Sequence, residues 1–225
     1  MNEGPKSRIR LKFARLRPAA DFTHLEQIKT FRARATASGL KFWPAKTGGG
    51  VIPRMAFGPA VSVGHESLCE YADLYLEEFV RDEAALEKIQ PLDDDKFRLL
   101  SARRIPVFFP SIEAAVNAAE YFLEADFPAG FSQVSLDAFM ALKSVPYEKV
   151  KPSGERKALD ARTPLLAASW DAPSSLLKLT LRLAPGKTIK PETVSELIAG
   201  GAPVFRRIVR KELYWMDSQG KLEVF

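Results

Sequence analysis

Strict alternation of apolar and polar residues in one segment constrains the fold more than any other feature of the sequence. The apolar positions are Leu177, Leu179, Leu181 and Leu183, and the positions between them are Lys178, Thr180 and Arg182. A period of two places successive side chains on opposite faces, as in a strand with one buried side. Related patterns recur at 7–16, 70–79 and 204–216. The chain is therefore expected to build sheets with one buried face.

Helices are expected between these strands. Thr23 and Glu26 fit a capping box, after which apolar residues recur at helical spacing as far as Gly39; they are Leu25, Ile28, Phe31 and Ala35. Asp82 is expected to cap a short helix that ends at Ile89. Pro191 and Gly200 mark the start and the end of a later helix.

The order of these elements in the first half is β-α-β-β-α-β, which is the ferredoxin-like unit. The second half repeats the pattern without repeating the sequence. We therefore predict an α+β fold of tandem ferredoxin-like (βαββαβ) units with antiparallel sheets, divided into residues 1–110 and 111–225. The polar segment 151–160 is expected to be an exposed loop or hairpin.

Composition excludes several classes of site. Cys69 is the only cysteine, so neither an internal disulfide nor a cysteine-only metal or iron–sulfur site is possible. His24 and His65 are the only histidines, and we expect no intrinsic metal or other cofactor. No apolar run approaches the roughly 18 residues of a membrane span, and the N-terminus lacks the apolar core of a secretory signal. A cytoplasmic protein that does not contact the membrane is expected.

Charge is segregated along the chain. Residues 1–58 hold twelve Lys or Arg against three acids, a net charge of +9, whereas residues 66–95 hold eleven acids against two cations, a net charge of −9. A basic face favours nucleic acid or an acidic partner. The alternative is a surface on which the two segments neutralise each other.

The cations of the first strand suggest an RNA-binding surface. Arg8, Arg10 and Lys12 are expected on its exposed side, and Tyr71 and Tyr75 alternate along the second strand. If the two strands are neighbours, cations could bind phosphates while the rings stack on bases. The predicted nucleic-acid-binding residues are Arg8, Arg10, Lys12, Arg32, Lys46 and Arg54. The alternative is a docking surface for an acidic protein.

Other positions are weaker candidates for a ligand site. Gly48, Gly49 and Gly50, between Lys46 and Arg54, could present backbone N–H groups to a phosphate, but they lack the spacing of a P-loop or a dinucleotide fingerprint. His24 is expected in the first turn of a helix and His65 in a turn. Both are more typical of structural histidines, and no catalytic residue is predicted.

Several segments resemble one known family. Met55–Gly64, Glu66–Ser67 and the strand that begins at Glu70 are similar to the radical-SAM-linked proteins of the domain-of-unknown-function class. Thr23–Leu25, 115–121 and 210–214 resemble further stretches of that family. The family usually has Gly-Phe-Asn-Pro-His-Pro where this chain has Gly48–Pro53, so the Asn and the His of that motif are absent.

The resemblance implies a domain that is fused to, or encoded beside, a radical SAM protein. Radical SAM chemistry needs three cysteines for its cluster, so a chain with only Cys69 is expected to be an accessory. Our hypothesis is that it presents RNA, transfer or ribosomal RNA, to that partner. One alternative is a module that only docks on the radical SAM protein. Another is a stand-alone RNA-processing enzyme, for which His24 would be the first candidate base.

Overall fold

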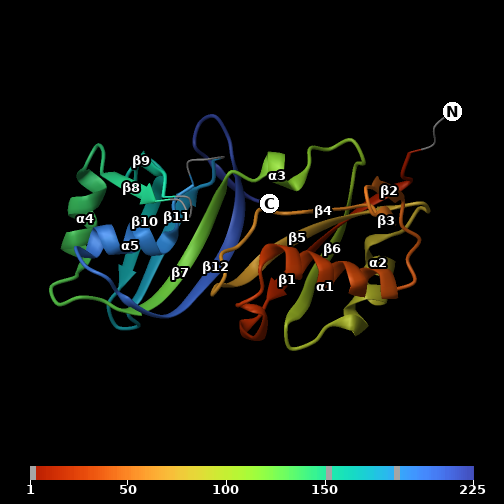
Figure 1. Ribbon diagram of the computed structural model, residues 1–225, viewed down its shortest axis with the longest axis horizontal. Helices are drawn as coiled ribbons and strands as arrows, with labels where there is room; N and C mark the ends of the chain where they lie inside the picture. Colours follow the sequence, from red (N-terminus) through yellow and green to blue (C-terminus); the bar gives the residue numbers. More distant parts are fainter. Residues whose placement is uncertain (1–3, 151–153, 185–187) are drawn as a thin grey trace. The chain divides into compact units, whose positions relative to one another are not determined.

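The computed structural model describes residues 4–150, 154–184 and 188–225 (Figure 1). The chain divides into two compact units, Met1–Val116 and Asn117–Phe225, whereas the boundary expected from the sequence lies at 110/111. The α+β class is confirmed, and the sheets are mostly antiparallel.

The first unit contains one sheet with the order β4-β5-β1-β6, in which each of these neighbours is antiparallel. A separate hairpin joins β2 and β3. The strands and helices are β1 (Ser7–Arg15), α1 (His24–Ala37), β2 (Pro44–Thr47), β3 (Gly50–Pro53), β4 (Met55–Phe57), β5 (Glu66–Leu76), α2 (Asp82–Ile89), β6 (Phe97–Ile105) and α3 (Ile112–Ala115). Short 3-10 turns occupy Arg17–Ala19 and Gln90–Leu92.

The second unit repeats this arrangement of elements. Its sheet has the order β10-β11-β7-β12, in which neighbouring strands are again antiparallel, and a hairpin joins β8 and β9. The elements are β7 (Ala118–Asp126), α4 (Gln133–Ala141), β8 (Pro146–Val150), β9 (Arg156–Asp160), β10 (Leu165–Asp171), β11 (Leu176–Arg182), α5 (Pro191–Ala199), β12 (Val204–Met216) and β13 (Leu222–Val224), which pairs with β12. Of the segment 151–160, residues 151–153 lie outside the described part.

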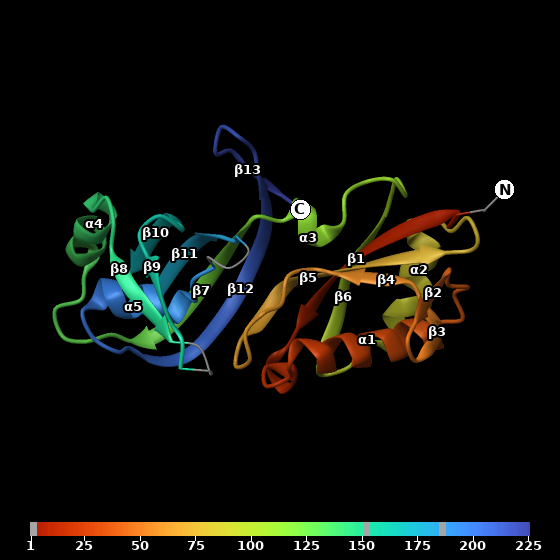
Figure 2. The same ribbon diagram turned by 45° about the horizontal axis from the view of Figure 1, so that its top comes forward.

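The core of the first unit lies between its sheet and helices α1 and α2. It joins Ile9, Leu11 and Phe13 of β1 to Phe31 of α1 and Ile89 of α2. Figures 1 and 2 show α1 and α3 on opposite sides of these strands. One face of the sheet is therefore closed by the core, and the opposite face meets α3 and the segment that precedes it.

Local rules predicted the ends of several helices well. The capping box of Thr23 and Glu26 forms, with the Glu26 carboxylate 2.7 Å from the Thr23 backbone nitrogen. Gly200 ends α5 with φ +65, a left-handed conformation that glycine adopts without a Cβ clash. Two details differ from expectation. Arg81, not Asp82, is the N-cap of α2, and Leu25 on α1 is 59% exposed while Gln27 is buried.

Candidate nucleic-acid interface

The pairing of β1 with β5 brings the predicted cations and tyrosines onto one face of the sheet, but Tyr71 and Tyr75 are only 3% and 7% exposed, so the expectation that their rings are open to bases is wrong. The register places Arg8 opposite Tyr75, Arg10 opposite Asp73 and Lys12 opposite Tyr71. Arg103 of β6 lies opposite Arg10 on the other side, and Arg54 stacks over the Tyr75 ring at 4.3 Å. We call this surface the cation–tyrosine face; its members are Arg8, Arg10, Lys12, Arg54, Tyr71, Asp73, Tyr75 and Arg103.

Asp73 is the centre of this face. Its side chain is completely buried, and its oxygens accept hydrogen bonds from both neighbouring arginines. Arg10 donates from Nε to Oδ1 at 2.8 Å and from Nη2 to Oδ2 at 2.9 Å, and Arg8 donates from Nε to Oδ2 at 3.0 Å. Because both oxygens are already engaged by guanidinium groups, Asp73 holds the two cations in place and is not positioned to act as a general base.

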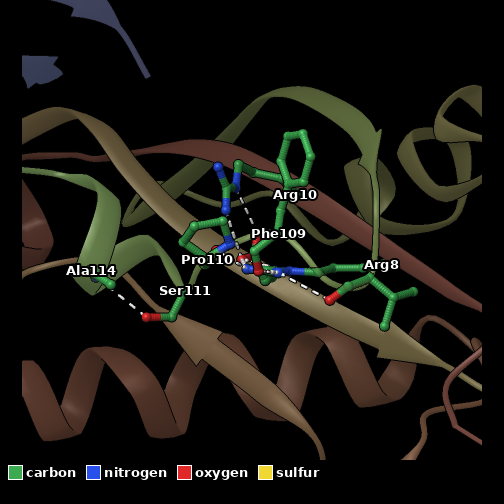
Figure 3. Close-up of polar contacts among 8 residues, drawn as sticks. Arg8, Arg10, Phe109, Pro110, Ser111 and Ala114 are labelled. Atoms are coloured by element: carbon green, nitrogen blue, oxygen red, sulfur yellow. Dashed lines mark hydrogen bonds and ion pairs between the residues drawn. The ribbon is translucent and has the colours of Figure 1, made fainter. Parts of the chain in front are cut away.

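The segment 106–111 covers Arg8 and supplies further acceptors for its guanidinium. The guanidinium donates to the carbonyl oxygens of Phe109 at 2.5 Å, Pro110 at 2.8 Å and Val107 at 3.4 Å (Figure 3). Arg8 is consequently only 1% exposed, so the expectation that it presents a free cation to solvent is wrong. A buried guanidinium needs a charge partner and acceptors for its donors, and Asp73 with the three carbonyls supplies both.

The other cations of the face remain nearer to solvent. The Arg10 side chain is 13% exposed, and Lys12 is half-buried, with its ammonium 5.6 Å from the centroid of the Tyr71 ring. Arg54 and Arg103 are exposed. Arg103 was not predicted from the sequence, although its place on the third strand of the surface follows once β6 pairs with β1.

Two of the predicted nucleic-acid-binding residues lie elsewhere. Arg32 stacks on Phe57 at 5.9 Å, and Phe57 packs against the core between the sheet and α1. Arg32 is therefore on the helical side of the sheet. Lys46 is exposed on the β2–β3 hairpin. The six predicted cations thus do not share one surface.

The glycine and histidine candidates do not form a common site. Gly48 and Gly49 are the turn of the β2–β3 hairpin, Gly50 begins β3, and a Cβ at any of the three would meet nothing within 4 Å. An open hairpin turn does not enclose a phosphate. His24 is the first residue of α1 and half-buried, whereas His65 is only 2% exposed in the turn before β5.

A buried polar network was missed by the sequence analysis. Arg15 donates to the Gln27 side-chain oxygen at 3.1 Å, and the Gln27 amide nitrogen donates to Glu70 at 2.8 Å. All three side chains are buried. One signal was present in the sequence, because Glu70 falls in phase with the core positions Ala72 and Leu74 of β5. Its partners could not be inferred, since they come from β1 and α1.

Ion pairs join the basic and acidic segments of the sequence. Besides Arg8 and Arg10 with Asp73, Arg34 pairs with Asp94, and Lys41 pairs with Glu78 at 2.5 Å. The hydrogen bond from Lys41 and its positive charge lower the pKa of the Glu78 carboxyl. The two segments therefore neutralise each other in part, as the alternative interpretation of the charge distribution requires.

The described residues offer neither a metal site nor a membrane-spanning helix. No cluster of three or more His, Cys, Asp or Glu side chains there is suited to hold a metal ion. Among the helices of the described segments, none combines the length and apolar character that a membrane span needs.

Comparison with known proteins gives a family and several distant structural likenesses. No curated protein matches the sequence significantly. Among solved structures, a chain of the "Crystal Structure of a Cbf5-Nop10-Gar1 Complex" aligns with a TM-score of 0.47 and 6% sequence identity. The alignment covers 90% of this chain and 48% of that chain, so the protein spans about half the length of the structure it matches.

The family comparison covers most of the sequence. The model of the family described as "Uncharacterized protein conserved in bacteria (DUF2344)" matches residues 8–191, a range that runs from the second residue of β1 to the start of α5 and includes every residue of the cation–tyrosine face. On the strength of that match, the chain belongs to the DUF2344 family.

Proposed function

We propose that the protein is a non-catalytic accessory that binds RNA through the cation–tyrosine face and acts with a radical SAM enzyme. The observation that carries the RNA-binding part is the charge of this face. Asp73 is paired with Arg8 and Arg10, of which Arg8 is buried, and the face carries three further cations, Lys12, Arg54 and Arg103. Such an excess of Lys and Arg on one surface provides the electrostatic attraction that dominates binding to the phosphate backbone.

The fold also supports this function. We infer that the two units are a tandem of ferredoxin-like units. In support, each unit runs β-α-β-β-α-β once its hairpin is set aside, and the strand orders β4-β5-β1-β6 and β10-β11-β7-β12 place corresponding strands in corresponding positions.

Binding of RNA is tested by neutralising the two exposed cations of the face. In R54Q/R103Q, we expect affinity for RNA at low salt to fall about tenfold or more. The slope of log affinity against log salt should decrease by roughly 0.7 for each phosphate that the variant no longer neutralises. Because both side chains are exposed and neither holds Asp73, the fold should be unaffected. Fluorescence anisotropy with labelled RNA at several salt concentrations measures both quantities.

The matched control is R156Q/K221Q in the second unit, which removes the same charge from exposed positions on β9 and the turn before β13. It should leave the salt slope and the affinity close to those of the wild type. Equal losses of affinity in the two double variants would show that only net charge matters and would contradict a binding face. Absence of RNA binding by the wild-type protein at low salt would overturn the proposal.

The partnership with a radical SAM enzyme rests on the resemblance of Met55–Gly64 and the other segments named above. The buried Cys69 agrees with an accessory role, since one thiol cannot ligate the cluster of that enzyme class. We expect tagged protein, expressed in its own organism, to co-purify with a radical SAM protein identified by mass spectrometry. Recovery that survives nuclease treatment indicates direct contact. Recovery in neither the treated nor the untreated lysate contradicts the partnership.

A further inference from the structure

Exposed aromatic side chains lie on two segments that leave the same end of the first unit's sheet. Phe108 is 86% exposed, Phe79 66% and Phe109 49%. We call these residues, with Val107 and Arg104, the aromatic rim. Apolar rings of this size rarely lie together in water without a partner, because stacking or burial would remove a large apolar area from solvent.

The sheet register explains why the two segments that carry these residues leave the sheet at the same end. Ser7 pairs with Leu76 at the end of β5, and Arg8 pairs with Ile105 at the end of β6. Phe79 follows β5 and Val107–Phe109 follow β6, so both chain segments leave the sheet beside the start of β1. The Ser7 hydroxyl fixes the first of them by donating to the Glu78 carbonyl oxygen at 2.7 Å.

The backbone that carries the rings is held by Arg8. Its guanidinium binds the carbonyl oxygens on both sides of Phe108, those of Val107 and Phe109 (Figure 3). Phe108 is therefore presented to solvent on an anchored segment, and its ring lies edge-on to Phe109 with centroids 5.6 Å apart. An anchored ring loses less conformational freedom when a ligand stacks on it.

Lys6 and Arg104 are cations at this end of the sheet. The Arg104 guanidinium lies 4.2 Å from the Phe79 ring centroid. A hollow of about 230 Å³ is lined by Lys6, Ser7, Arg104, Ile105, Pro106 and Val107. Acids are also present at this end: Glu78 is bound to Lys41 at 2.5 Å, and the Asp82 carboxylate accepts a hydrogen bond from the Arg104 backbone. Rings interleaved with Arg and Lys fit a ligand that has both flat faces and negative charge.

We propose that the aromatic rim binds a single-stranded segment of the RNA, with a base stacked on Phe108 and phosphates near Lys6 and Arg104. This inference rests on the RNA-binding function proposed above and adds the form of the RNA. Single strands are favoured because their unstacked bases can stack on an aromatic side chain, whereas a duplex keeps its base faces covered. The rim adjoins the cation–tyrosine face through Arg8, which binds the Val107 and Phe109 carbonyl oxygens, whereas Arg104 lies opposite the core residue Ile9 and so on the helical side of the sheet.

The test compares Phe108→Ala with Phe108→Tyr in the full chain. For a single-stranded oligonucleotide, F108A should weaken binding about tenfold, within the range that loss of one stacked base produces. F108Y keeps a ring and should bind like the wild type. For the duplex of the same sequence, neither variant should change the affinity. A 2-aminopurine base in the single strand should be quenched on binding to the wild type and F108Y, and much less on binding to F108A.

The outcomes separate this inference from the proposed function. If the wild type binds RNA and R54Q/R103Q weakens binding while F108A does not, the stacking inference is wrong and RNA binding stands. If F108A leaves RNA affinity unchanged but abolishes capture of the radical SAM protein, the rim is a protein-docking surface and the inference is overturned. If the wild type binds no RNA, both proposals fail.

Discussion

Asp73→Ala is expected to lower the free energy of unfolding of the first unit by about 3–5 kcal/mol, because it leaves a buried arginine without its counterion. Arg8 is 1% exposed, and segment 106–111 closes over it through three carbonyl oxygens. Carbonyl dipoles alone compensate a full positive charge only in part.

The measurement must report on the first unit alone, since a chain of two compact units need not unfold in one step. The chain has three tryptophans, of which Trp43 lies in the first unit. In a W170F/W215F background, Trp43 fluorescence during urea denaturation therefore follows that unit. The free energy is obtained from the midpoint and slope of this transition.

Two further variants make the Asp73 result interpretable. Asp126→Ala breaks the Arg206–Asp126 pair, whose side chains are 50% and 64% exposed, and should cost less than about 1 kcal/mol. R8M/D73L removes the buried Arg8 charge together with Asp73 and takes the carboxylate only from Arg10, which is partly exposed, so the double variant should be more stable than Asp73→Ala. A loss of stability in Asp73→Ala no larger than that of Asp126→Ala would show that Arg8 is solvated in the protein.

The parts of the fold that were predictable from sequence depend on neighbouring residues only. The extent of β12, the capping box at Thr23 and the left-handed Gly200 follow from alternation, reciprocal backbone bonding and the missing Cβ. Each can be inferred from a short window. The β2–β3 hairpin was not predicted, because its strands have four residues each and show too little alternation to stand out from a glycine loop.

The candidate site was predictable only in part, for a corresponding reason. Alternation placed Arg8, Arg10 and Lys12 on one side of β1, but burial of that side depends on segment 106–111, about a hundred residues later in the chain. The same limit applies to Gln27. Its helical position suggests a solvent-facing amide, yet Arg15 and Glu70 from two different strands form a polar pocket for it, and Leu25 turns outward instead.

Phe13→Ala is expected to cost about 3–5 kcal/mol of unfolding free energy, the usual range for truncating a buried phenylalanine. Phe13 is 1% exposed in β1, between β5 and β6, so its surroundings have little room to collapse into the space left behind. Its ring stacks on Phe31 with centroids 4.3 Å apart and meets Phe97 edge-on at 6.0 Å. The truncation therefore removes ring packing against α1 and β6 together.

Phe108→Ala is the matched control for Phe13→Ala, since it makes the same chemical change at a ring that is 86% exposed. Its effect on stability should stay within about 0.5 kcal/mol. With Trp43 as the probe, Phe13→Ala should shift the unfolding midpoint strongly without a large change in slope. Similar midpoints for the two variants would place Phe13 outside the core. A stable Phe108→Ala protein would also show that any loss of RNA affinity in that variant comes from the missing ring and not from unfolding.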